Sequence, residues 1–422
     1  MRKQLIAAAI AAALAPGMAL ATDGYFAHGY GMKAIGMGGV GIALPQDALA
    51  PATNPAGLTM VGNRVDFGAM IFHPVRGAEI QGSGNPPANG SYNGNDSASF
   101  VIPEFGYSRT IDPKLTVGVA VYGNGGMNTN YKQSPFAGYG GTNPGGVDLM
   151  QLFIAPTVAY KLNDTNSVGL SVNFAYQRFK AEGLDPFKMA SWSGNDVTNN
   201  GYDSSTGWGV RIGWTGQISP TVTLGATYQS KTKMGKLDKY KGLFANEGEF
   251  DIPENYGIGI AVKTTPKLTL AADVEQINYS KIAAVGDPVD CLFAGACQLG
   301  GPNGAGFGWR DVTVLKLGAS YQYRDDLVLR AGFNTLRQPI PESQTLFNIL
   351  APGVVEQHLT AGATWTLANG NELTLAYMHA FKKEVNGAPG SIPPGMPPGY
   401  GGGTANLHMY EDSIGIAYGI KM

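Results

Sequence analysis

The side chains that carry most enzymatic chemistry are few and scattered in this sequence. Histidine occurs five times, at positions that follow no metal-ligand spacing: His28, His73, His358, His379 and His408. The G-x-S-x-G pattern of a nucleophile elbow is absent. Serine, histidine and aspartate could still converge inside a folded chain, but the sequence indicates no such set. We therefore expect neither an enzyme nor a bound metal or other cofactor.

The chemistry that the sequence does offer is the binding of an anionic group by a buried cation. In the alternating stretches described below, Arg211, Lys316 and Arg330 fall on the face that would point inward. Such a cation can hold a carboxylate by a charge-assisted hydrogen bond. The alternative is that these cations pair with inward carboxylates or with residues near the N-terminus such as Asp23 and Asp47. An aromatic hydrocarbon would need no cation at all.

The N-terminus predicts export from the cytoplasm. Arg2 and Lys3 precede an apolar run over residues 5–15, which is too short to cross a bilayer as a helix. Residues 19–21 read Ala-Leu-Ala, a typical cleavage site. We expect residues 1–21 to be a signal peptide, and a retained anchor helix is the weaker alternative.

The two cysteines, Cys291 and Cys297, lie close together in one long predicted loop. Export to an oxidising compartment favours a local disulfide between them. A metal site is the weaker alternative, because two thiols without a nearby histidine make an incomplete ligand set.

The composition is that of a weakly charged, glycine-rich chain. Charged residues make up 14% of the 422 residues, below an average of about 25%. Glycine occurs 61 times, roughly double its usual share of about 7%. The net charge of −2 argues against a nucleic-acid partner. After the N-terminus, no run approaches the length of an apolar transmembrane helix.

Alternation of apolar and polar or small residues is the main secondary-structure signal. Residues 167–177 illustrate it, because every second side chain from Val168 to Tyr176 is apolar. About fourteen such stretches predict strands at 63–73, 98–109, 114–123, 149–161, 166–180, 207–217, 221–231, 254–263, 267–278, 310–323, 327–336, 355–367, 372–382 and 409–422.

The connections between these stretches are alternately short and long. Those after even-numbered stretches are tight turns, such as Thr110-Ile111-Asp112-Pro113, whereas those after odd-numbered stretches are long and rich in Gly, Pro and Asn. This pattern is typical of a closed antiparallel barrel whose tight turns face one compartment and whose loops face the other. We predict an all-β transmembrane barrel of about fourteen strands in a bacterial outer membrane. It would be a monomer in contact with membrane lipid and lipopolysaccharide, with both chain ends and the tight turns in the periplasm.

Residues 22–62 do not alternate and are rich in small residues. Their glycine spacing resembles a dinucleotide fingerprint only loosely, and no βαβ unit surrounds it. A segment of this kind can pack closely inside a narrow lumen, so we expect an N-terminal hatch over 22–62 and a barrel over 63–422. The candidate hatch residues are Gly36, Gly38, Gly39, Asp47, Asn54, Pro55 and Ala56.

The chain resembles the FadL/TodX family of outer-membrane transporters for long-chain fatty acids and aromatic hydrocarbons. The similar motifs are Gly36-Met37-Gly38-Gly39, Asp47-Ala48, Asn54-Pro55-Ala56-Gly57-Leu58, Pro253-Glu254-Asn255-Tyr256-Gly257 and several strand segments from Trp309 to Tyr377. The resemblance implies passive uptake of hydrophobic compounds. It also implies ligand capture by extracellular loops, an apolar pocket, and lateral exit through a gap made by a kinked third strand.

In this chain the third predicted strand is rich in glycine, at Gly118, Gly123, Gly125 and Gly126. Glycine there could interrupt the strand ladder and bend the strand. The alternative is that these glycines only begin a loop.

Several long loops carry apolar residues that could form a capture surface. They include Phe136, Leu243, Phe244, Leu346, Phe347, Ile349 and Leu350. An exposed apolar cluster usually binds something, whereas the alternative is that these side chains pack against one another as loop cores. A general porin and an adhesion barrel are the competing functions, and the predicted hatch argues against an open porin.

Overall fold

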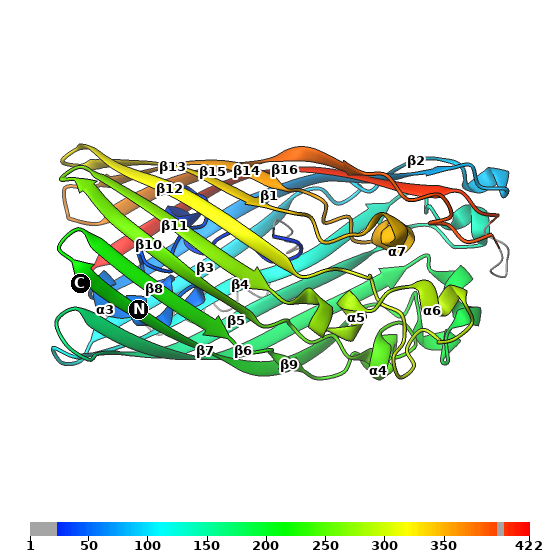
Figure 1. The fold of residues 1–422 in the computed structure, drawn as a ribbon, viewed down its shortest axis with the longest axis horizontal. Coiled ribbons are helices and arrows are strands. Elements are labelled where there is room, and N and C mark those ends of the chain that lie inside the picture. The colour runs from blue at the N-terminus through cyan, green and yellow to red at the C-terminus, as the bar shows by residue number, and fades with distance from the viewer. Residues whose placement is uncertain (1–22, 395–400) are drawn as a thin grey trace.

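The computed structural model describes residues 23–394 and 401–422 of the chain. Their strands form one antiparallel sheet that closes on itself (Figure 1), because β16 pairs with β1 from Arg64 opposite Lys421 to Gln81 opposite Thr404. Within the described residues the sheet has sixteen strands, of which β2 (Gly90–Asn93) and β9 (Lys233–Met234) are short additions. The remaining fourteen strands form the wall, so the predicted transmembrane barrel is confirmed.

The wall strands follow one another in chain order around the barrel. They are β1 (Arg64–Gln81), β3 (Phe100–Thr110), β4 (Leu115–Tyr131), β5 (Gly145–Lys161), β6 (Asn166–Glu182), β7 (Asp203–Ser219), β8 (Val222–Gln229), β10 (Asn255–Thr265), β11 (Leu268–Ile277), β12 (Val312–Arg324), β13 (Leu327–Leu336), β14 (Gln357–Thr366), β15 (Glu372–Val385) and β16 (Thr404–Lys421).

Each predicted stretch corresponds to one wall strand, and the short and long connections alternate as expected. In Figure 1 the tight turns lie at the left with the C-terminus, and the long loops lie at the right. The main difference is that β1, β4, β5, β7 and β16 run several residues farther toward the loops. Those extensions contain glycine and polar residues, so their side chains do not alternate although their backbones stay paired.

The outer face of the wall is apolar, as a lipid-facing barrel requires. Ile258 and Leu359 are more than half exposed, and Trp208 and Tyr323 show the same exposure near strand ends. Beside Leu359 the neighbouring side chains of His358 and Thr360 are buried instead, and the positions on either side of Ile258 and Trp208 are glycines. The outward positions therefore supply the lipid contact, and the inward positions hold the polar groups considered below.

The helices are all short and lie in the loops or in the N-terminal part of the chain. They are α2 (Met32–Ile35), α3 (Leu58–Val61), α4 (Ala245–Gly248), α5 (Ala283–Gly286), α6 (Asp290–Phe293) and α7 (Thr345–Asn348). No helix in residues 23–394 and 401–422 is long and apolar enough to cross a membrane. The predicted signal peptide over 1–21 lies outside the described residues.

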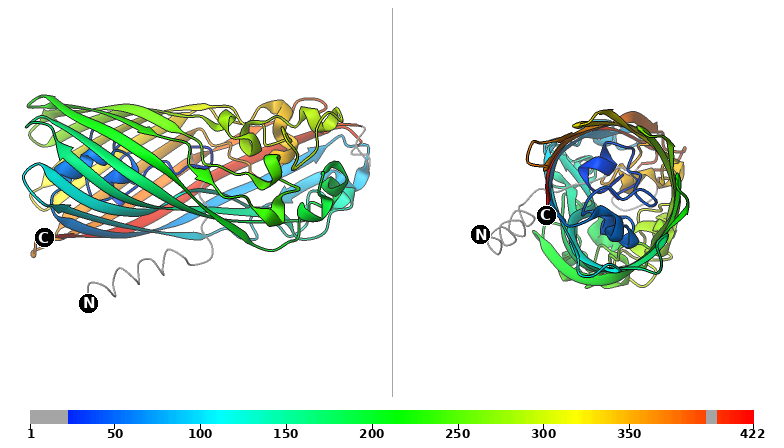
Figure 2. Two further views of the ribbon diagram at one scale, coloured as in Figure 1. Left: turned by 90° about the horizontal axis from the view of Figure 1, so that it is seen from below. Right: turned by 90° about the vertical axis from the view of Figure 1, so that its left-hand side faces the viewer.

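Residues 23–62, hereafter the N-terminal segment, lie inside the barrel (Figure 2, right). Most of these residues are buried, and the exceptions lie mainly at residues 44–46 and at the end of the segment. Gly38 shows why glycine is needed, since its φ is +72° and a Cβ there would lie 2.7 Å from the backbone oxygen of Leu317 in the wall. The small residues of the segment thus allow its backbone to touch the wall strands directly.

Candidate functional site

A small apolar cavity of about 30 Å³ lies beneath the long loops. Its lining combines the upper ends of β5 and β6 with residues from several loops: Val147, Phe179, Leu184, Phe187, Leu243, Phe244, Ala284, Leu299, Ala305, Gly306, Phe307, Phe347 and Leu350. Four of the predicted capture residues are among them. The other lining residues come from β5, β6 and distant loops, whose convergence was not visible in the sequence. We call this space the loop cavity.

The predicted capture residues do not form an exposed surface. Phe136, Leu346 and Ile349 are completely buried, and Phe244 and Phe347 nearly so. They pack into a continuous apolar cluster in which aromatic rings meet edge to face, as Phe187 does with Phe136 and Phe347 at 5.1 and 5.0 Å. The alternative of a loop core therefore describes the structure, because burial of so many apolar side chains is more favourable than leaving them in water.

A chain of aromatic rings leads from the loop cavity toward the barrel interior. Phe244 contacts Phe250 with ring centres 4.9 Å apart, and Phe250 lies 6.2 Å from Tyr25 of the N-terminal segment. Tyr25 also packs against Tyr279 and Trp309 at 5.2 and 5.9 Å. The first residues of the segment thus end an apolar path that begins under the loops.

The start of the N-terminal segment is held by polar contacts to the wall. Asp23 lies 3.4 Å from the Lys316 ammonium and accepts a 3.1 Å hydrogen bond from Asn334. Lys316 also binds Glu275 at 2.8 Å. Burial raises the pKa of Asp23 to about 6, although Lys316 opposes the rise.

Asn54 ties the middle of the segment to the opposite wall. Its side-chain Nδ2 donates to the backbone oxygens of Ile42 and Trp214 at 2.7 and 2.9 Å. Its Oδ1 accepts a 3.1 Å hydrogen bond from the Ala56 N–H and so caps the short helical turn that Pro55 begins. The side chain is completely buried, so all three bonds replace contacts with water.

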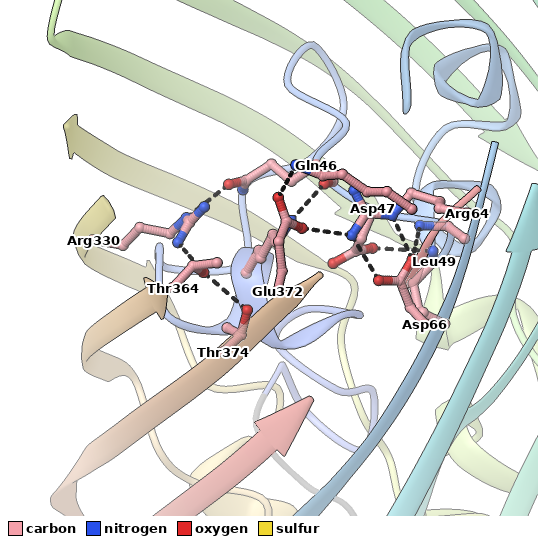
Figure 3. Close-up of polar contacts among 12 residues, drawn as sticks. Gln46, Asp47, Leu49, Arg64, Asp66, Arg330, Thr364, Glu372 and Thr374 are labelled. Atoms are coloured by element: carbon pink, nitrogen blue, oxygen red, sulfur yellow. Dashed lines mark hydrogen bonds and ion pairs between the residues drawn. The ribbon is translucent and has the colours of Figure 1, made fainter. Parts of the chain in front are cut away.

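A network of charges connects the segment to both edges of the barrel closure (Figure 3). Glu372 at the start of β15 binds Lys33 of the segment at 2.5 Å and Arg64 of β1 at 2.8 Å. Lys421 near the end of β16 reaches the same carboxylate at 2.7 Å. Arg64 also binds Asp66 at 2.7 Å. This network, which we call the closure network, includes groups from β1, β15, β16 and the segment.

Asp47 lies within the same region. It accepts a hydrogen bond from the Leu49 N–H at 3.0 Å, while the neighbouring Ala48 N–H donates to Asp66 at 2.9 Å. Burial raises the pKa of Asp47 to about 6, and the nearby Asp66 carboxylate adds to the rise.

The three predicted inward cations all contact the N-terminal segment. Arg211 donates to the Thr53 backbone oxygen at 2.8 Å and to the Gln229 side chain at 2.6 Å. Arg330 donates to Gln46 at 2.8 Å (Figure 3), and Lys316 binds Asp23 as described above. Their contacts correspond to the alternative of pairing with residues near the N-terminus, although only Lys316 does so through a carboxylate.

The wall is interrupted between β3 and β4. Their pairing runs only from Thr110 opposite Thr116 to Phe105 opposite Val121. Beyond Val121, β4 stays paired with β5 but has no β3 partner, and its register shifts between Gly123 and Gly125. We call this gap the wall gap.

The glycines predicted for a kink play different parts in the wall gap. Gly118 was expected to interrupt the ladder. In the structure it is regularly paired, opposite Ser108 of β3 and Thr157 of β5, so the ladder is not interrupted at this residue. A Cβ on Gly125 would lie 2.0 Å from the Tyr25 oxygen, and Gly126 donates a 3.0 Å hydrogen bond to that oxygen. The glycines thus let the segment approach β4.

The N-terminal segment covers the wall gap from inside. Phe26 forms an antiparallel bridge with Gly125, and the Ala27 N–H donates to the Asn124 oxygen at 3.1 Å. Residues 25–27 therefore occupy part of the free edge that β3 leaves on β4. A cavity of about 20 Å³ remains beside them, lined in part by Ile102 of β3 and Gly123 of β4.

Two further features lie outside this path. A disulfide joins Cys291 and Cys297 in the long loop between β11 and β12, where Phe293 packs against Phe347 of the loop cavity. His28 and His358 stack inside the barrel with ring centres 6.0 Å apart. In the described parts of the chain, no three His, Cys, Asp or Glu side chains converge on a position suited to a metal ion.

A closed, lipid-facing barrel with an interrupted wall and an internal N-terminal segment defines a class of outer-membrane transport barrels. The family model described as outer membrane protein transport protein (OMPP1/FadL/TodX) matches residues 7–391, and the chain belongs to that family.

Several known proteins are similar over nearly the whole chain. The long-chain fatty acid transport protein of Escherichia coli K12 is 23% identical, with 89% of this chain and 93% of that protein covered. The Salmonella typhi protein of the same name is also 23% identical, with the same coverage. The structure of the Pseudomonas putida toluene transporter TodX covers 94% of this chain and 99% of its own, with a TM-score of 0.70 at 17% identity. A Pseudomonas aeruginosa FadL homologue gives the same TM-score and coverage at 15% identity.

Proposed function

We propose that this protein carries hydrophobic compounds passively across the outer membrane, and that they leave sideways through the wall gap. The observation that carries the proposal is the loss of pairing between β3 and β4 beside a lumen filled by the N-terminal segment. An axial route would have to pass that segment, whereas the gap opens directly toward lipid. The names of the relatives, which describe transporters of long-chain fatty acids and of toluene, support this class of ligand.

The loop cavity is the proposed capture site. Its volume of about 30 Å³ holds little more than one water molecule, whereas ligand pockets usually measure about 300–1,000 Å³. Capture therefore requires the loops to separate, with a hydrophobic ligand replacing contacts that Phe244 and Phe347 now make with their neighbours. The aromatic chain through Phe250 and Tyr25 then offers an apolar path inward.

The N-terminal segment acts in this proposal as a hatch and its residues 25–27 as a gate. The contacts of Asn54 and of the closure network hold the body of the segment in place. The gate itself is fixed to β4 by few hydrogen bonds, at Ala27 and Gly126. Local release of 25–27 costs less than release of the whole segment, so a ligand arriving beside Tyr25 can open the gap while the axial path stays closed.

The lumen contacts favour an uncharged ligand while the segment is seated. Arg211, Lys316 and Arg330 already bond to the segment or to wall residues. A fatty-acid carboxylate would have to displace one of those partners, whereas an aromatic hydrocarbon displaces none. Comparison of labelled toluene with labelled oleate distinguishes these two ligand classes.

Uptake into liposomes containing the purified barrel tests the proposal. We expect faster uptake of labelled toluene or oleate than in empty liposomes, and a change in uptake when residues 22–45 are deleted. Phe347→Ala, which enlarges the loop cavity, should alter uptake, whereas Tyr323→Ala on the lipid face should not. Equal uptake by protein-containing and empty liposomes would refute the transport function, and a large steady conductance of the intact protein would favour a porin.

A further inference from the structure

Arg76 is a completely buried arginine on the inward face of β1, next to the upper end of the wall gap. Its guanidinium forms no ion pair in the described part of the chain. Instead, it donates to the Asn128 oxygen and Oδ1 at 2.8 and 2.6 Å, to the oxygens of Pro74 and Ser97 at 2.9 and 2.7 Å, and to Asn95 Oδ1 at 3.1 Å. All five N–H groups of the side chain are therefore used.

These acceptors belong to three pieces of chain at the point where the short β1–β2 ladder ends, with Gly77 opposite Asn93. Pro74 lies on β1, Asn128 lies on β4, and Asn95 and Ser97 lie in the connection before β3 begins at Phe100. The same connection receives backbone bonds from both sides, since the Gly94 N–H donates to the Arg76 oxygen at 3.1 Å and the Asn130 N–H donates to the Gly94 oxygen at 3.0 Å. Arg76 and residues 94–97 thus bridge β1 and β4 where β3 is missing.

The wall gap therefore has two defined borders. The lower border is the last paired couple of β3 and β4, Phe105 with Val121. The upper border is the bridge at Asn128. Between these borders β4 runs for about six residues, or roughly 20 Å at the usual rise of a strand.

We propose that Arg76 is a positioning residue that fixes the upper border of the wall gap and so limits the size of ligand that can leave through it. The proposal rests on the lateral exit proposed above. Only arginine offers five donors in a planar fork, and lysine offers three from a single point. Without the fork, residues 94–97 keep their bonds to Asn130 but lose the hold on Asn128, so the upper border moves toward Asn130 and the opening lengthens toward the loops.

The test compares the uptake of a large and a small aromatic hydrocarbon, pyrene and toluene, into liposomes containing the full-length barrel. We expect Arg76→Lys and Asn95→Ala to raise the pyrene-to-toluene ratio several-fold. Asn95→Ala removes one acceptor of the guanidinium together with the Asn95 side-chain bonds to the Arg76 backbone and to Asn93. It serves as the second variant if Arg76→Lys does not fold, and folding is checked by the heat-dependent gel shift of barrels. Arg337→Lys, an exposed arginine in another loop, is the matched control and should leave the ratio unchanged.

A second arm separates this proposal from the lateral exit on which it rests. Cysteines introduced by Ile102→Cys and Gly123→Cys on the two sides of the gap are joined by a bis-maleimide, which does not react with the native disulfide. If the linked barrel takes up both probes at the unlinked rate, lateral exit is wrong and the role of Arg76 falls with it. If linking blocks uptake but the folded Arg76→Lys and Asn95→Ala variants keep the native ratio, only the role of Arg76 is overturned.

Discussion

Replacement of Asn54 by alanine should loosen the N-terminal segment without unfolding the barrel. The change removes three hydrogen bonds and leaves the buried backbone oxygens of Ile42 and Trp214 without this donor. The Trp214 bond joins the segment to the wall, and the bonds with Ile42 and Ala56 hold the segment's own fold, so all three count against a released segment that has lost that fold. At roughly 0.5–1.5 kcal/mol per bond, the seated segment should lose about 3 kcal/mol relative to that released state. Because about 1.4 kcal/mol corresponds to a factor of ten, the released population should rise roughly 100-fold.

Single-channel recording in planar bilayers measures that population directly, since release of the segment opens an aqueous path through the lumen. We expect brief openings of Asn54→Ala to occur far more often than those of the native protein, and faster hydrogen exchange over residues 31–58. Asn163→Ala, in an exposed tight turn, is the matched control and should behave as the native protein. Unchanged openings together with unchanged exchange in Asn54→Ala would refute the anchoring role of this side chain.

Three further predictions concern charges and the disulfide. Glu372→Gln leaves the cations around it without their shared carboxylate, so the barrel should lose about 3 kcal/mol of stability in urea unfolding; the exposed Glu384→Gln should lose far less, and equal losses would contradict the closure network. The raised pKa of Asp47, about 6 against an ordinary value near 3.8, means that the seated segment gains stability as the pH falls from 7 to 4. Channel openings of the native protein should therefore become rarer as the pH falls, and Asp47→Asn should weaken this decrease. An identical pH profile of openings in the native protein and in Asp47→Asn would contradict the role of Asp47. Cys291→Ser should speed hydrogen exchange in residues 287–300 while leaving barrel unfolding unchanged; a reductant should do the same to the native protein but not to the variant.

The strands could be predicted from the sequence because a lipid-facing wall imposes a period of two on every strand. The same constraint weakens toward the loops, where backbone pairing alone continues β4 through Gly125 to Tyr131 and β16 begins at Thr404. The two short strands β2 and β9 escaped prediction for the same reason, since neither has a repeated apolar face.

The side-chain contacts were harder to predict because they join residues far apart in the chain. Alternation correctly placed Arg211, Lys316 and Arg330 inside the barrel, but it could not select their partners. The pairing of Lys33 with Glu372 spans most of the sequence, and Arg76 gave no signal because its acceptors are mostly backbone and amide oxygens. The apolar loop residues were identified, yet only the converged loops show that they are buried.

The closure network has a consequence for assembly. Its groups come from the N-terminal segment, from the first wall strand and from the last two, so the network can form only when the whole chain is present. Because Glu372 binds Lys33, Arg64 and Lys421 together, seating of the segment and closure of β1 on β16 are thermodynamically coupled. Such coupling is reciprocal. The free energy by which the seated segment stabilises closure of the wall equals the free energy by which the closed wall stabilises seating of the segment. An incorrectly placed segment would therefore weaken the last joint of the barrel, and the insertion of a leaking channel would be disfavoured at its final step.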